Sequence, residues 1–202
     1  MQLGRMMVAA LLAAGVVGTA GSAAQAQATD KPLSLRLGGF LPSDEDTQDA
    51  LGTNFLSWGV GYDLKRFNSF LPGVVEAYFD FYKRPKNTAD FGRVEALVLG
   101  LGLATRFEYQ ADGYKPYVGA GAGLYSSYFS QTLPPGTNGS ATPLVDSARR
   151  VSLGGKFLIG AELDNGIFGE AEYNFVPHPS VFGSDISLSG FQLRLGYRFR
   201  PF

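Results

Sequence analysis

The feature that most constrains the fold is the alternation of residue types in the C-terminal segment, residues 190–202. Large apolar side chains occupy the odd positions from Phe191 to Phe199, and polar or very small residues occupy the even ones. Because successive side chains of a strand point to opposite faces, this period of two predicts a strand with one apolar and one polar face. An unpaired terminal strand would invite aggregation, so we expect it to pair with the first strand and close a barrel.

The same alternation recurs along the rest of the chain. It covers residues 33–38, 55–65, 74–82, 93–107, 117–128, 151–163 and 167–175. With the closing segment these predict about eight strands, each near the 9–11 residues that a tilted strand needs to cross a bilayer. Short turns near residues 68, 112 and 165 alternate with longer polar loops near residues 46, 87, 136 and 183. This arrangement is typical of an all-β, eight-stranded antiparallel up-and-down barrel that spans an outer membrane.

The N-terminus has the features of a secretory signal peptide. Arg5 supplies a positive charge, residues 6–20 are apolar, and Ala26-Gln27-Ala28 fits the small-x-small rule for cleavage. We therefore expect residues 1–28 to be removed on export and residues 29–202 to form the barrel domain. An anchoring helix is the weaker alternative, because the apolar run ends before the roughly 20 residues that a membrane helix needs.

The composition argues against several classes of function. The 17 Lys and Arg residues nearly balance the 18 Asp and Glu residues, so no basic excess points to nucleic acid. The absence of Cys excludes a disulfide framework and a thiolate metal site. No cluster of His, Asp and Glu has the spacing of metal ligands, and we expect neither a metal nor a cofactor.

Alternation alone does not show which face points inward. A soluble eight-stranded barrel such as a lipocalin would place the apolar residues inside. Here the large apolar side chains would overfill a narrow interior, whereas the opposite face is rich in Gly, Ala and Ser. Aromatic residues also occur at strand ends, as in the girdles of membrane barrels: Phe55, Phe67, Phe107, Tyr109, Phe175, Phe199 and Phe202. We therefore expect the apolar face to contact lipid.

An outward apolar face places the charged residues of the strands in the lumen. The expected bases are Arg36, Lys65, Arg106, Lys156, Arg194 and Arg198, and the expected acids are Asp63, Glu76, Asp80, Glu162, Glu170 and Glu172. The two sets are equal in number, and neighbouring strands carry complementary charges, so we expect a network of ion pairs. Because an unpaired buried charge is costly, the simplest role of this network is to neutralise a closed lumen. A gated ion path is the functional alternative.

The C-terminal segment resembles the closing strand of bacterial outer-membrane barrels, which ends on Phe after alternating aromatic residues, here Tyr197, Phe199 and Phe202. The whole chain is similar to small barrels such as the OmpA transmembrane domain, the opacity proteins and OmpW. The resemblance implies contact with outer-membrane lipid and lipopolysaccharide, and assembly by periplasmic chaperones and the barrel assembly machinery, which would recognise the C-terminal segment. It also implies a structural or interaction role, with loops facing an unknown host or surface ligand. The similarity to OmpW implies, as an alternative, a narrow channel for small or hydrophobic solutes.

The single histidine permits one catalytic hypothesis. His178 and Ser180, in Val176-Pro177-His178-Pro179-Ser180, resemble the His-x-Ser of the PagL-type lipid A deacylases. In that family an acid on the last strand orients the His, and the Ser is the nucleophile. The matching position here is Gln192, which cannot stabilise an imidazolium as a carboxylate does. We therefore do not expect an enzyme, and keep His178 and Ser180 as the candidates for a catalytic role.

Overall fold

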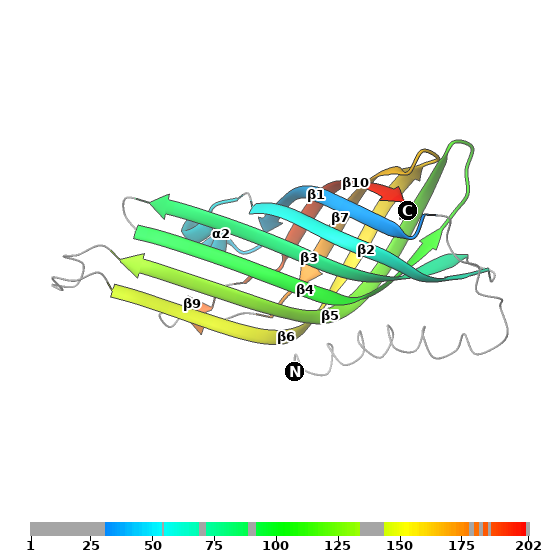
Figure 1. The fold of residues 1–202 in the computed structure, drawn as a ribbon. Helices are drawn as coiled ribbons and strands as arrows, with labels where there is room; N and C mark the ends of the chain where they lie inside the picture. The colour runs from blue at the N-terminus through cyan, green and yellow to red at the C-terminus, as the bar shows by residue number, and fades with distance from the viewer. Residues whose placement is uncertain are drawn as a thin grey trace.

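The strands of the chain close into one antiparallel barrel. The computed structural model describes residues 31–53, 55–68, 72–88, 92–133, 144–177, 180–181, 184–185 and 187–200. The barrel strands are β1 (Leu33–Pro42), β2 (Phe55–Phe67), β3 (Gly73–Thr88), β4 (Gly92–Glu108), β5 (Tyr114–Leu133), β6 (Leu144–Leu163), β7 (Ile167–Phe175) and β10 (Gly190–Phe199). Their order around the barrel is β1-β10-β7-β6-β5-β4-β3-β2 (Figure 1), so the predicted eight-stranded up-and-down barrel is confirmed. The predicted signal peptide, residues 1–28, lies outside the described residues.

Pairing of the first and last strands closes the barrel. Leu33 lies opposite Phe199, and the antiparallel register continues without a break to Pro42 opposite Gly190. The beginning of β1 and the end of β10 therefore lie on the same side of the barrel as the short connections between β2 and β3, β4 and β5, and β6 and β7. We call this side the turn end and the opposite side the loop end.

The alternation sorts side chains into an apolar outer face and a buried inner face. On β10, Leu193 and Leu195 are 62% and 70% exposed, whereas Arg194 between them is 3% exposed. A surface of exposed leucine and aromatic side chains is unfavourable in water and favourable in lipid. A closed barrel also satisfies every backbone hydrogen bond of the spanning strands. The predicted outward orientation of the apolar face agrees with these exposures.

Strands β3 to β6 are longer than the sequence predicts. Of the segments interpreted as loops, residues 83–87 are strand, and so are the described parts of residues 130–147, namely 130–133 and 144–147. Their backbones pair although their side chains no longer alternate between apolar and polar, with Ser130 opposite Ser147, for example. Past the last pairing of β3 with β2, the four strands form an extension at the loop end, residues 84–88, 92–96, 129–133 and 144–148. In Figure 1 it reaches beyond β1 and β10 on the left.

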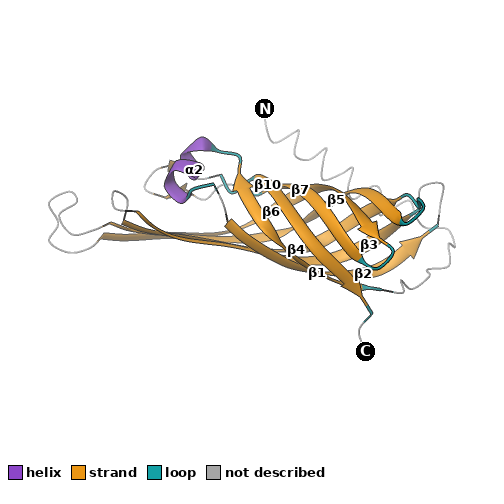
Figure 2. Cartoon of the chain, turned by 90° about the horizontal axis from the view of Figure 1, so that it is seen from above, coloured by secondary structure: helices purple, strands orange, loops and turns teal. Residues whose placement is uncertain are grey.

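The polar loop expected near residue 46 contains a short helix, α2 (Glu45–Leu51), at the loop end (Figure 2). Asp44 caps the helix, because its side chain accepts hydrogen bonds from the backbone N–H of Thr47 at 2.9 Å and from the hydroxyl of Thr47 at 2.7 Å. The helix ends at Gly52, which has a φ of 81°. Among the described residues, no helix is both long and apolar enough to cross a membrane. Two short strands, β8 (Ser180–Val181) and β9 (Ser184–Asp185), pair within the connection from β7 to β10.

The glycine-rich inner face makes room for aromatic rings. Tyr125 lies opposite Gly100, and Tyr117 lies opposite Gly160. A Cβ atom on Gly160 would lie 2.6 Å from Cζ of Tyr117, and one on Gly100 would lie 2.8 Å from Cε1 of Tyr125. Both distances are shorter than real Cβ contacts, so each ring occupies the volume that a side chain on the facing strand would fill. The lumen is thus packed by pairing a large residue with glycine across neighbouring strands.

Replacing such a glycine is expected to destabilise the barrel. In Gly160→Val the ring of Tyr117 must move, and its hydroxyl loses the 3.1 Å hydrogen bond that it donates to Glu170. Overpacking of this kind lowers the free energy of unfolding by about 1–3 kcal/mol. Urea unfolding of the protein in lipid vesicles measures the loss. Gly39→Val is the control, because a Cβ there meets only the carbonyl oxygen of Phe55, at 3.9 Å. Equal losses in the two variants would contradict this account of the glycine face.

Candidate functional site: the charged lumen

Ion-paired side chains fill the turn-end and central parts of the lumen. The structure brings together, each in at least one ion pair, the predicted residues Arg36, Asp63, Glu76, Asp80, Arg106, Lys156, Glu162, Glu170, Glu172, Arg194 and Arg198. All of these residues are charged, and all of them are buried. They reach one another because alternate positions of one strand, and the residues paired with them on the next, point to the same side of the sheet.

One cluster of ion pairs lies toward the turn end. Arg106 pairs with Glu76 and, at 3.2 Å, with Asp63. Arg198 contacts the same Asp63 carboxylate at 2.8 Å and Glu162 at 2.9 Å. Asp63 of β2 thus joins β4 to β10 across the lumen, and each guanidinium pairs with three carboxylates. Planar guanidinium groups suit this arrangement because their N–H donors form a fixed fork.

A second cluster lies closer to the middle of the strands. Lys156 donates to Asp80 at 3.0 Å and to Glu172 at 3.4 Å. Arg194 pairs with the same two carboxylates and, at 3.3 Å, with Glu170. Two bases and two acids therefore form a closed ring of alternating charge from β3, β6, β7 and β10. The side chains of this ring are fully shielded from solvent.

Arg36 of β1 connects the two clusters. It pairs with Glu76 of the turn-end cluster and, through Nε, with Glu170 at 3.2 Å. Aromatic rings line the same space, and Nζ of Lys156 lies 3.7 Å from the ring centroid of Tyr78. At this distance the ring face attracts the ammonium group. The lumen therefore contains one connected network rather than isolated pairs.

The prediction that Lys65 belongs to this network is wrong. The pairing of β2 with β3 shifts between Asp63 and Lys65, so Leu64 is an extra residue in the strand. This irregularity moves Lys65 to the other face, where it is exposed. Arg66 takes the inward position and pairs with Glu108 at 2.9 Å. A period-two interpretation of the sequence assumes an unbroken register and cannot locate such a shift.

Glu108 was also missed, because it lies at the turn end of β4 beyond the expected strand. It pairs with Arg66 and, at 3.2 Å, with Arg106. Sequence periodicity therefore misses one base, Arg66, and one acid, Glu108, of the ion-paired network.

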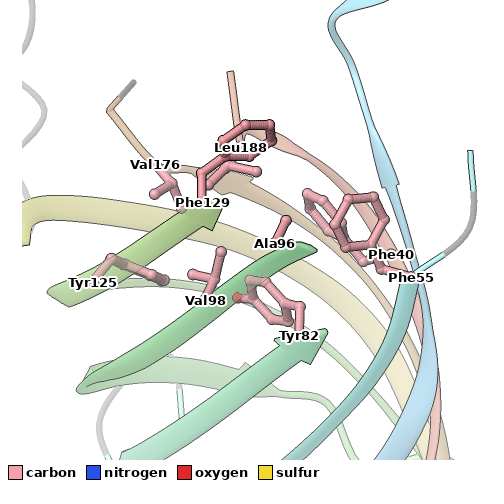
Figure 3. Packing of buried hydrophobic residues seen from close by; sticks show 9 residues of the cluster. All are labelled: Phe40, Phe55, Tyr82, Ala96, Val98, Tyr125, Phe129, Val176 and Leu188. Atoms are coloured by element: carbon pink, nitrogen blue, oxygen red, sulfur yellow. The ribbon is translucent and has the colours of Figure 1, made fainter. Parts of the chain in front are cut away.

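An apolar cluster closes the lumen at the loop end (Figure 3). Its members are Phe40, Phe55, Tyr82, Ala96, Val98, Tyr125, Phe129, Val176 and Leu188, all buried. The ring of Phe40 stacks on Tyr82 at 5.0 Å between centroids and meets Phe55 edge-on at 5.4 Å. The expectation that Phe55 belongs to an outer aromatic girdle is therefore wrong, because Leu56, not Phe55, occupies the outward position. Sequence periodicity did not reveal this cluster, since its members belong to the face interpreted as polar.

The structure describes only some of the other predicted site residues. Tyr197 and Phe199 stack with their ring centroids 6.1 Å apart, and Phe202 lies outside the described residues. His178 also lies outside them, and of Ser180 only the backbone of β8 is described. The deacylase hypothesis therefore stays a prediction.

Gln192, at the position that matches the acid of the deacylases, faces the lumen. Gln192 is fully buried and accepts a hydrogen bond from Asn174 at 3.1 Å. Within the described ranges, no group of three or more His, Asp or Glu side chains is arranged to hold a metal ion.

Breaking the inner ring of charges is expected to cost much stability. Arg194→Met leaves Asp80 and Glu172 sharing only Lys156, and removal of one partner from a buried ion pair costs about 3–5 kcal/mol. Urea unfolding in lipid vesicles should show a loss of this size. Arg149→Met is the matched control, because Arg149 is exposed and only donates to Ser126 at 3.4 Å. A loss no larger than that of the control would show that the ring does not stabilise the barrel.

Comparison with known proteins agrees with this architecture. The model of the outer membrane protein beta-barrel domain family matches residues 9–199. Neisserial surface protein A has a TM-score of 0.52 at 15% identity, over 84% of this chain and 94% of that chain. Ail of Yersinia pestis has a TM-score of 0.48 at 16% identity, over 85% and 100%. The outer membrane enzyme PagL has a TM-score of 0.46 at 14% identity, over 83% and 99%.

Comparison with curated protein sequences returns no match. At this identity, the likeness to Neisserial surface protein A supports the barrel fold alone. The family model, in contrast, covers nearly the whole chain, including every strand of the barrel. The chain belongs to the outer membrane protein beta-barrel domain family and is a protein of the bacterial outer membrane.

Proposed function

We propose that the protein is a closed barrel with a structural and interaction role, which holds the extension of β3 to β6 outside the cell. The observation that carries the proposal is the filled lumen. The ion-pair network occupies its turn-end and central parts, and the apolar cluster occupies its loop end. A barrel of eight strands is only wide enough for side chains to fill it. Because a filled lumen leaves no path for transport, the role that we propose is interaction at the surface.

The loop end suits contact with partners in water. In outer-membrane barrels the longer connections are extracellular, and on this ground we assign the extension to the outside of the cell. Ser147 is exposed on the extension, and Lys83 beside it pairs with Glu95 at 2.8 Å. The helix α2 contacts β1 and β4 near the same end. The extension is thus a folded surface, supported by backbone pairing, that can present side chains to a ligand.

The closed lumen predicts a barrel that does not conduct. Refolded mature protein in a planar lipid bilayer is expected to show no discrete openings, with a heat-shifted band on a gel confirming folding beforehand. The physical reason is that ions would have to displace Arg194 and Lys156 from Asp80 and Glu172. Discrete openings of the wild-type protein would contradict the closed barrel.

A narrow channel is the alternative, and one observation favours it. The hydroxyl groups of Ser57 and Tyr82 and the side-chain nitrogen of Gln192 are buried with no hydrogen-bond partner among the described residues. Buried polar groups of this kind are commonly bound by water. Openings whose conductance Arg194→Met alters would support the channel.

Surface display of the extension can be tested by labelling, because the chain has no Cys. Ser147 is exposed in the extension, and Asp112 is exposed at the turn end. In intact cells, a membrane-impermeant maleimide is expected to label Ser147→Cys, whereas Asp112→Cys should react only after the outer membrane is opened. The opposite pattern would reverse the orientation and remove the interaction surface from the cell exterior.

A further inference from the structure

A groove interrupts the outer, lipid-facing surface over β6, β7, β10 and β1. Its volume is about 470 Å³, and the outward side chains that line it are Leu37, Ile159, Gly169, Ala171, Leu193 and Leu195. The groove exists because the outward residues of β7 here, Gly169 and Ala171, are small, and β6 also carries a small residue, Ala161, opposite Gly169. A Cβ on Gly169 would meet only Cδ2 of Leu195, at 3.6 Å, so the space above this glycine is open.

Aromatic side chains bound the groove on the side of the loop end. On β7, Tyr173 and Phe175 lie 4.6 Å apart between ring centroids. Tyr173 also contacts Phe191 of β10 at 4.8 Å, and Phe175 contacts Phe157 of β6 at 5.8 Å. These four rings, which we call the aromatic wall, form a continuous barrier across three strands. A long occupant therefore enters the groove from the turn end.

A positive charge lies at the turn end below the groove. From Gly169, β7 leads back to the turn at Gly166, about 10 Å away along the strand. There Lys31 donates from Nζ to the carbonyl oxygen of Asp164 at 2.9 Å, in an exposed position. Ammonium groups at this level of a barrel face the head groups of the leaflet on the turn side, where they attract phosphate.

We propose that this groove binds one acyl chain of a phospholipid from the periplasmic leaflet, with the lipid phosphate beside Lys31. The groove is continuous with the lipid-facing surface, so an apolar chain reaches it without leaving the membrane. The aromatic wall excludes chains that descend from the outer leaflet. The proposal goes beyond the interaction role of the extension and does not depend on it.

The test measures lipid that stays on the protein. The full mature chain is refolded in vesicles of phosphatidylethanolamine and lipid A, extracted in mild detergent, and examined by native mass spectrometry. The wild-type protein is expected to retain one phosphatidylethanolamine. Gly169→Leu fills the groove and should retain severalfold less, and Lys31→Gln should reduce retention as well. Ala122→Leu places the same leucine side chain at an exposed outward position of β5 outside the groove and should retain as much as the wild type.

Folding is checked separately by the heat-shifted gel band. If Gly169→Leu fails to fold, Ala171→Leu fills the same groove from the next outward position of β7. Undiminished retention in a folded groove-filling variant would overturn the proposal. Retention of lipid A in place of phosphatidylethanolamine would assign the occupant to the other leaflet, and a dimer that Gly169→Leu abolishes would assign the groove to a second copy; either result overturns it. These outcomes are independent of conductance and of surface labelling.

Discussion

Neutralisation of charge inside the barrel is the constraint on which the rest of the structure depends. Removing a carboxylate or a guanidinium from water is expensive, and the cost is recovered only when each group has well-placed partners of opposite charge. In this lumen, Asp63 is shared by two arginines, and Arg194 is shared by three carboxylates. Partners come from strands far apart in sequence, so the network is complete only when the barrel is closed. Closure and neutralisation therefore occur together.

The charges also explain how a membrane protein of this kind avoids long apolar segments. If the inward residues of β7, for instance, were apolar instead of glutamate, the strand would become a continuous apolar run. Runs of this kind, when long enough, behave as membrane helices. Alternating Glu170 and Glu172 with small or aromatic outward residues keeps the strand polar on average while one face remains compatible with lipid. Burying charged residues in the lumen costs free energy, but the same residues keep the unfolded chain polar enough to cross an aqueous compartment.

Periodicity in the sequence was sufficient for the fold class, the strand order and most of the lumenal charges, because each depends only on which face a residue occupies. It failed where the register changes or where both faces are polar. Leu64 disrupts the register of β2, and so Lys65 was assigned to the wrong face. The extension was interpreted as loop because its strands lack the alternation that lipid imposes. The apolar cluster around Phe40 was missed because it depends on contacts between strands and not on the pattern within one.

The unequal lengths of the strands give the molecule a tall side and a low side. β3 to β6 extend past β1, β7 and β10 at the loop end (Figure 1). In the orientation that we propose, a large partner that arrives from outside would be screened on one flank and admitted on the other. The direction of approach would thereby be set by the backbone, before any side chain is recognised. A change of side chains at this end would then change which partner is bound while leaving the angle of binding unchanged.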